Sequence, residues 1–292
     1  MSVAAKPGEH APNQKSIMKR RDFLKTSLAT SALAGVGAAS LDLAAAESTG
    51  GMGREYYEWR AYRLKSGNHE LLDAYLEKAA IPAWNRLGIR PVGVFAQQER
   101  STAPAGTEVR DANLVFVLLP YPSLDSFATA GARLAADAEY QKAGAAYLQT
   151  PKANPAFDRL DSWLMLAFAG MPKLEQPVYS RERKPRMFEV RTYESYSEVK
   201  GQKKVEMFNS GEIETMREVG LGPIFYGQGL SGANLPHLTY MLSAENEEAH
   251  KKHWDAFGKH PVWNRLKNDP QYADTVSKIY NRFLVPTAYS QV

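Results

Sequence analysis

Two stretches of the chain carry the same order of hydrophobic patterns. Apolar and polar residues alternate over 55–64 and again over 186–195, and this alternation predicts half-buried strands. A helical periodicity follows each strand, over 67–87 and over 200–219. Because the first strand and the helix return together about half a chain later, the sequence predicts an internal repeat of two copies.

Each copy continues with three further strands and a second helix. Gly88 and Gly220 are predicted to end the first helices, and Ser123 and Ser243 to begin the second ones. The glycine-rich run 227–232 is predicted to be the loop between two strands. The further strands, first copy before second, are predicted at 91–98, 113–120, 158–168, 223–229, 236–242 and 278–286.

The order of these elements predicts the fold class. Strand, helix, strand, strand, helix, strand is the βαββαβ order of a ferredoxin-like unit, which leaves one face of its sheet without helices. Two units can bury these faces against each other. We therefore expect an α+β protein in which tandem units at 54–169 and 186–292 form an intramolecular α+β barrel, with 170–185 as the linker.

The first strand of each copy carries the pattern aromatic-Glu-x-Arg-x-Tyr, at 57–62 and at 188–193. Side chains alternate across a strand, so the Glu, Arg and Tyr of each copy share one face. We expect that face to point into the barrel and the apolar set to face the helices. The candidate ligand-binding residues of the barrel interior are therefore Glu58, Arg60, Tyr62, Glu189, Arg191 and Tyr193.

Two interpretations of these six residues remain open. A buried charge is costly unless it is paired, and a Glu and an Arg two positions apart on one face are able to pair. One interpretation is a polar core that satisfies itself and fixes the packing. The other is a cavity that presents two arginines and two tyrosines to an anionic or polar ligand.

The same motifs resemble the NIPSNAP family. Besides the Glu-x-Arg-x-Tyr strand and the helix that ends in glycine, the second copy has a Trp-x-x-Phe run at 254–257 and a Trp at 263, as in that family. His260 stands where the family more often has Asp. The resemblance covers most of 54–292. It implies the dimeric α+β barrel fold but carries over no catalytic residue.

The N-terminal stretch 1–46 resembles a twin-arginine export signal. The weakly apolar segment after the basic motif is too short for a stable membrane span, and small residues predict cleavage after Ala46. The translocase of that pathway would deliver the protein to the periplasm or the medium, and either Met1 or Met18 serves as the start. The motif residues are Arg20, Arg21, Phe23 and Leu24.

Composition narrows the function classes further. The chain has a formal net charge of +4, but the predicted signal holds six of the basic and three of the acidic residues, so the remainder carries +1. The apparent basicity therefore gives no support for an acidic partner. The absence of cysteine excludes disulfides, a thiolate nucleophile and cysteine-ligated zinc or iron–sulfur clusters.

Three histidines are the candidates for metal ligation. His250 and His253 are spaced i, i+3 on a predicted helix, with His237 on a nearby strand, and imidazoles so placed could bind a metal. Acidic and basic residues surround the helical pair, however. A charged helix surface is the favoured interpretation, and no metal site is favoured.

These observations lead to a hypothesis with two alternatives. The hypothesis is an exported NIPSNAP-type protein that binds a small polar or aromatic ligand in the barrel, with no cofactor required by the sequence. One alternative is a cofactor-poor or haem-binding enzyme, of monooxygenase or isomerase type, acting in the same cavity. The other is a structural or interaction domain with a filled barrel. No nucleic-acid motif is found, and either a monomer or a homodimer is compatible with the repeat.

Overall fold

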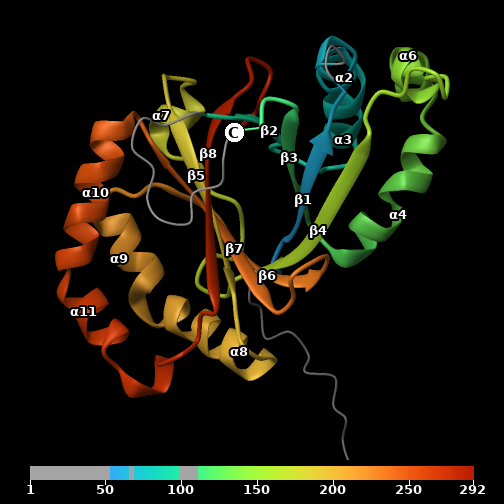
Figure 1. Cartoon of the computed structure of the whole chain (residues 1–292). Helices are drawn as coiled ribbons and strands as arrows, with labels where there is room; N and C mark the ends of the chain where they lie inside the picture. Colours follow the sequence, from blue (N-terminus) through green and yellow to red (C-terminus); the bar gives the residue numbers. More distant parts are fainter. Residues whose placement is uncertain (1–52, 66–68, 99–110) are drawn as a thin grey trace, which may run out of the picture. The chain divides into compact units, whose positions relative to one another are not determined.

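The computed structural model describes residues 53–65, 69–98 and 111–292, and within them eight antiparallel strands close a barrel (Figure 1). Around the barrel the strands follow the order β1-β3-β2-β8-β5-β7-β6-β4. Their bounds are β1 Tyr56–Arg63, β2 Gly93–Gln97, β3 Leu114–Tyr121, β4 Arg159–Ala167, β5 Met187–Glu194, β6 Pro223–Ser231, β7 His237–Ala244 and β8 Lys278–Pro286.

The strand order confirms the predicted fold class. The first half contributes four neighbouring strands in the order β4-β1-β3-β2, and the second half repeats it as β8-β5-β7-β6. Each half is therefore one ferredoxin-like sheet. Two seams join the halves: β2 pairs with β8, and β4 pairs with β6 across an irregularity between Leu164 and Met165.

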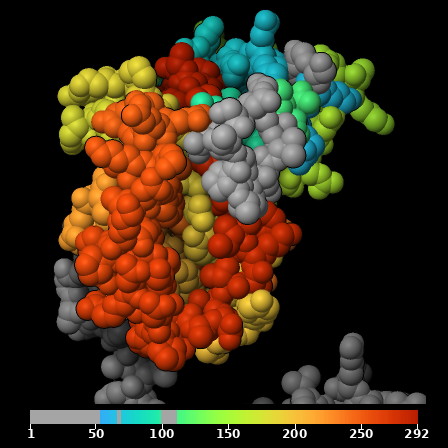
Figure 2. Space-filling model, turned by 60° about the vertical axis from the view of Figure 1, so that its left-hand side comes forward, coloured from blue at the N-terminus to red at the C-terminus, as the bar shows by residue number. Residues whose placement is uncertain are grey.

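Helices cover the outside of each half-barrel, those of the first half on one side and those of the second half on the other (Figure 1). Figure 2 shows α10 and α11 as the surface over the second half. In both halves a π-helical turn, η1 or η2, interrupts the first helix. The bounds are α2 His69–Tyr75, η1 Leu76–Ala80, α3 Ile81–Arg86, α4 Leu124–Ala135, α5 Ala138–Ala143, α6 Ala145–Leu148, α7 Val178–Arg181, α8 Glu198–Met207, η2 Phe208–Glu212, α9 Ile213–Glu218, α10 Glu247–Lys259, α11 Pro261–Lys267 and η3 Pro270–Tyr272.

Three of the four predicted helix ends are confirmed. Gly88 and Gly220 follow their helices with φ of +79° and +85°, a left-handed conformation that glycine adopts without strain. The Ser123 side chain accepts a hydrogen bond from a backbone N–H in the first turn of α4. Ser243 was the wrong choice for the second half, because it lies within β7 and Asn246 caps α10 instead.

The prediction of which strand face points inward is wrong. Tyr57, Trp59 and Ala61 of β1 pack with residues of both halves inside the barrel, including Phe188 and Val190 of β5. The opposite face of β1, with Glu58, Arg60 and Tyr62, lies under the helices of the first half. The same reversal holds for Glu189, Arg191 and Tyr193 of β5.

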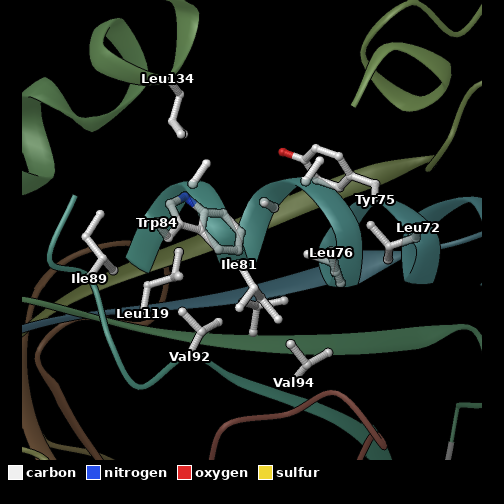
Figure 3. Close-up of a cluster of buried hydrophobic side chains, with 14 of the residues drawn as sticks. Leu72, Tyr75, Leu76, Ile81, Trp84, Ile89, Val92, Val94, Leu119 and Leu134 are labelled. Carbon is white, nitrogen blue, oxygen red and sulfur yellow. The ribbon is translucent and has the colours of Figure 1, made fainter. Parts of the chain in front are cut away.

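The reversal has a physical reason. The interior of an eight-stranded barrel is just wide enough for side chains to fill it, and large apolar groups gain most from burial there. A Glu–Arg pair needs further polar partners, and neighbouring strands and the covering helices supply them. Figure 3 shows the helix side of the first half, where Trp84, Leu76 and Ile81 pack against Val94 and Leu119 of the sheet and against Val92, which directly precedes β2.

The glycine-rich run also differs from its predicted role as a loop. Strand β6 continues to Ser231, so Gly227 and Gly229 lie inside it. A Cβ atom at these two positions would lie 2.8 Å from Met165 and 2.7 Å from His237. Glycine is therefore needed in β6 because neighbouring side chains occupy the space that a larger residue would take.

Two further predictions concern other parts of the chain. The predicted export signal, residues 1–46 with its cleavage position, lies outside the described residues. The segment predicted as a linker, 170–185, contains the short helix α7. Among the described residues, none of the helices is both long and apolar enough to cross a membrane.

Candidate functional site

One end of the barrel holds a pocket of about 70 Å³, which we call the mouth pocket. It forms where β1, β4, β5, β7 and β8 turn their inner faces toward the same space. Its walls combine aromatic rings, hydroxyl groups, an imidazole and a guanidinium. The lining residues are Trp59, Trp163, Met165, Thr192, Ala233, Asn234, His237, Thr239, Tyr280 and Arg282.

The opposite end of the barrel is filled by side chains. Tyr57, Phe188 and Phe225 pack together there with Val292, and all four are fully buried. The main-chain oxygen of Val292 accepts a hydrogen bond of 2.8 Å from Arg186, which holds the residue against the barrel. A ligand that enters the barrel therefore has room at the mouth pocket and not at this end.

Polar groups line the inner face of the mouth pocket. The hydroxyl groups of Thr192 and Thr239 lie 2.8 Å apart on neighbouring strands, and Thr239 Oγ1 lies 3.5 Å from Nδ1 of His237. Glu194 is paired with His237 in the register of β5 and β7. Burial lowers the pKa of His237, and the charge of Glu194 offsets this only in part.

The polar motif of the first half forms a self-satisfied cluster under the helices. Arg60 donates two hydrogen bonds to the Glu58 carboxylate, at 2.7 and 2.9 Å, and Tyr121 and Ser162 donate one each at 2.8 Å. Burial alone would raise the pKa of Glu58, but the Arg60 guanidinium and these donors hold it below its usual range. Arg60 also lies over the Trp84 ring.

The equivalent carboxylate of the second half has different partners. Glu189 accepts hydrogen bonds from Arg191 at 2.7 Å and from Trp254 of α10 at 2.8 Å, and His250 Nε2 lies 2.8 Å from the same oxygen as the indole. Burial works against ionisation, but the His250 contact and the Arg191 charge lower the pKa of Glu189 to about 2. The Arg191 guanidinium lies 4.9 Å from the centre of the Trp254 ring.

A second buried ion pair stands beside this carboxylate. Lys204 of α8 donates a 3.0 Å hydrogen bond to Glu212 of η2, and both side chains are buried. Burial raises the pKa of Glu212, and the Lys204 charge opposes the rise. Next to the pair, the hydroxyl groups of Tyr193 and Tyr240 lie 2.9 Å apart. This region is a connected polar core.

Comparison with known proteins places the chain among relatives of the same architecture. The NIPSNAP family model matches residues 57–150 and again residues 188–291, which together make up more than half of the sequence. The chain belongs to the NIPSNAP family. The two matches correspond to the two ferredoxin-like halves of the barrel.

Solved structures share the fold of this NIPSNAP chain at low sequence identity. A candidate monooxygenase from Fusobacterium nucleatum matches with a TM-score of 0.53 and 11% identity, over 80% of this chain and 93% of the other. One from Lactobacillus acidophilus matches with 0.50 and 8%, over 80% and 94%. A haem-binding protein from Thermus thermophilus matches with 0.40 and 15%, over 81% and 92%. No curated protein matches the sequence.

The three histidines singled out in the NIPSNAP sequence do not meet. His237 lies in the wall of the mouth pocket, whereas His250 contacts Glu189 beneath α10. His253 packs against the position of Gly220 at the end of α9. Within the described parts of the chain, no group of three or more His, Asp or Glu side chains is placed to hold a metal ion.

The mouth pocket of this NIPSNAP chain contains none of the six residues proposed from the repeated motif. Alternation alone could have indicated part of it, because Trp59 and Thr192 lie on the strand faces opposite to Glu58 and Glu189. Tyr280 and Arg282 have no such signal. They belong to the last strand, whose repeat partner in the first half has a different sequence.

Proposed function

We propose that the chain is an exported NIPSNAP protein that binds a small polar or aromatic molecule in the mouth pocket. The observation that supports this most directly is the contrast between the two ends of the barrel. One end is packed with apolar side chains, and the other leaves a hollow lined by aromatic, hydroxyl and basic groups. Ligand sites commonly combine an apolar lining with a few placed polar groups.

The volume of the hollow limits what can enter. About 70 Å³ is far below the ~300–1,000 Å³ that pockets for drug-sized ligands occupy. The barrel interior therefore admits one end of a small molecule, with the rest in the mouth. A haem does not fit inside the barrel beside the side chains that fill it.

A ligand screen by thermal shift tests the binding proposal. A molecule present at 100 times its dissociation constant should stabilise the protein by about 2.7 kcal/mol. Ala233 is exposed and lines the pocket, so Ala233→Trp should cover the mouth and abolish the stabilisation. Ala136→Trp, at an exposed position beyond α4, is the matched control and should respond like the parent protein. Equal responses of both variants would contradict binding in the mouth pocket.

An enzyme acting in the same pocket is the second candidate. The buried imidazole of His237 next to Glu194 favours it, because such a group can accept a proton from a bound molecule. The chain also shares its fold with two candidate monooxygenases. Mass spectrometry of a screened ligand after aerobic incubation tests this candidate. Recovery of the unchanged molecule would leave binding as the function.

Export is proposed from the N-terminal motif alone. Replacing Arg20 and Arg21 by Lys should retain the protein in the cytoplasm, whereas the unaltered chain should reach the periplasm or the medium. N-terminal sequencing of the exported protein should begin at Glu47, after cleavage at Ala46. An intact Met1 or Met18 on cytoplasmic protein would contradict this proposal.

A further inference from the structure

A second hollow, which we call the basic groove, lies at the filled end of the barrel, opposite the mouth pocket. Its volume is about 460 Å³, and it forms between the segment that leads into β5 and the residues at and after the end of β8. Arg183, Lys184 and Arg186 line one side, and Pro286 and Thr287 are among the residues of the other. Among the described residues that line the groove, none is acidic.

Positive charge is concentrated in the sequence beside this groove. The six residues 181–186 include four basic side chains and one acidic side chain, Glu182. The Glu182 carboxylate lies 2.7 Å from Nζ of Lys184, so this lysine is paired. Within the part of the chain that the structure describes, no side-chain carboxylate lies within 4.0 Å of the guanidinium groups of Arg183 and Arg186. The groove therefore has an excess of positive charge.

Arg186 is held firmly in the wall of the groove. Its guanidinium donates hydrogen bonds to the main-chain oxygens of Lys184 at 3.1 Å and Val292 at 2.8 Å, and it lies 5.9 Å from the centre of the Phe188 ring. The two hydrogen bonds leave further N–H groups of the planar guanidinium for another acceptor. Burial lowers the pKa of Arg186, and the nearby charge of Arg183 lowers it further. An anion in the groove would offset both effects.

The turn that carries the other two cations is fixed by its backbone. The N–H of Arg183 donates to the main-chain oxygen of Ser180 at 3.0 Å, and the N–H of Lys184 donates to that of Tyr179 at 2.9 Å. The Tyr179 hydroxyl lies 2.8 Å from the hydroxyl of Ser243 in β7. Because the backbone is already placed, a bound anion has to order only the ends of the two long side chains.

We propose that the basic groove binds a phosphate group carried by a small organic molecule, with Arg183, Lys184 and Arg186 as its cationic partners. A phosphate monoester carries about −1.5 to −2 charges at neutral pH, so it offsets several cations where a carboxylate offsets one. The planar guanidinium also matches the spacing of phosphate oxygens. Val285 and Pro286 offer an apolar wall to the organic part. The site is separate from the mouth pocket and does not depend on the function proposed for that pocket.

Calorimetric titration of the full chain, in phosphate-free buffer at low ionic strength, tests the proposal. Glycerol 3-phosphate should bind, whereas glycerol, which has the same organic body without the phosphate group, should not. Added sodium chloride should weaken the binding, because salt screens charges that are partly exposed.

A soluble phosphate ester and a phospholipid headgroup share this chemistry, and vesicles distinguish the two sources. The full chain is sedimented with vesicles of phosphatidylcholine and phosphatidic acid, and with vesicles of phosphatidylcholine alone. Binding of glycerol 3-phosphate together with the vesicles that contain phosphatidic acid indicates a lipid headgroup. Binding of glycerol 3-phosphate alone indicates a soluble ester.

Two matched double variants locate the site. Arg183→Gln combined with Lys184→Gln removes two exposed cations from the groove and should weaken the binding of glycerol 3-phosphate about tenfold or more, since one hydrogen bond to a charged group accounts for such a difference. Arg265→Gln combined with Lys267→Gln makes the same change of charge at exposed positions of α11 and should bind like the parent protein.

Four outcomes would overturn the proposal. The first is no binding of glycerol 3-phosphate, and the second is equal binding of glycerol. The third is a groove variant that loses no more affinity than the α11 variant. The fourth is binding to vesicles that contain phosphatidic acid without binding of the free ester, because it would indicate a general attraction to anionic surfaces.

Discussion

The two halves of the barrel bury the same Glu-x-Arg-x-Tyr motif in different surroundings. Glu58 is held by residues of the sheet alone, whereas Glu189 also contacts His250 and Trp254 of α10. The motif thus specifies a buried carboxylate paired with its own arginine. The remaining partners that such a carboxylate needs come from whichever element lies nearest.

The helices that cover the two halves also differ in polarity, at one equivalent place. When the π-helical turns η1 and η2 are aligned, Lys204 and Glu212 stand where the first half has Leu72 and Ala80. One half has an apolar contact at this place, and the other has a buried ion pair. The comparison shows that the fold itself does not require the ion pair, which therefore reflects the sequence of the second half only.

Removing the arginine should produce the largest difference between the halves. Arg60→Leu leaves Glu58 without a cation, and losing one partner of a buried pair costs about 3–5 kcal/mol. Arg191→Leu should cost about 2 kcal/mol, the value of a hydrogen bond to a charged group, because His250 and Trp254 still hold Glu189. Urea unfolding at neutral pH measures both losses. Equal losses would show that α10 contributes nothing to the second cluster.

Breaking the second ion pair should have the next largest effect. Lys204→Leu alone leaves Glu212 buried without its cation and should cost about 3 kcal/mol. Lys204→Leu combined with Glu212→Ala reproduces the residues of the first half and should be within about 1 kcal/mol of the parent protein, or more stable. The free energy of unfolding of the single and double variants decides this. A double variant as unstable as the single one would mean that the halves are not interchangeable here.

Acidic pH should reduce the stability contributed by Glu189 more than that contributed by Glu58. The pKa of Glu189 is lowered to about 2, so the stability it contributes is fully present above pH ~4.5 and is lost as the pH falls toward ~2. A shift of this size corresponds to about 3 kcal/mol. The deficit of Glu189→Gln relative to the parent protein should therefore shrink between these pH values, and that of Glu58→Gln should shrink less. Urea unfolding at several pH values tests this, and a pH-independent deficit would contradict it.

Much of the fold follows from local patterns in the sequence. The alternation in the strands, the helical periods and the glycines at 88 and 220 are properties of short segments, and they predict the order of elements and the repeat. The inward face of β1 does not follow from them. Both faces of β1 are mostly buried, and period-two alternation says which residues share a face but not which face is enclosed by the barrel.

The mouth pocket does not follow from the sequence either, for a related reason. Its wall depends on contacts between segments that are distant in sequence, such as Met165 against Gly227 and Trp163 against Gly232. In the sequence the glycine-rich run has the composition of a loop, although in the barrel it is a strand that makes room for neighbouring rings. Long-range pairing of this kind leaves no periodic signal in a single sequence.

The covalent joining of the two halves has a consequence for the symmetry of the barrel. In a barrel made of two identical chains, a twofold axis would place every inward residue twice, and any change would occur at both places. Here β5 and β7 pair Thr192 with Thr239, where the first half pairs Ala61 with Phe116. Tandem fusion thus allows polar hydroxyls on one side of the approximate twofold axis and apolar groups on the other. The cavity can therefore be polar while the free-energy cost of burying polar groups arises on one side only.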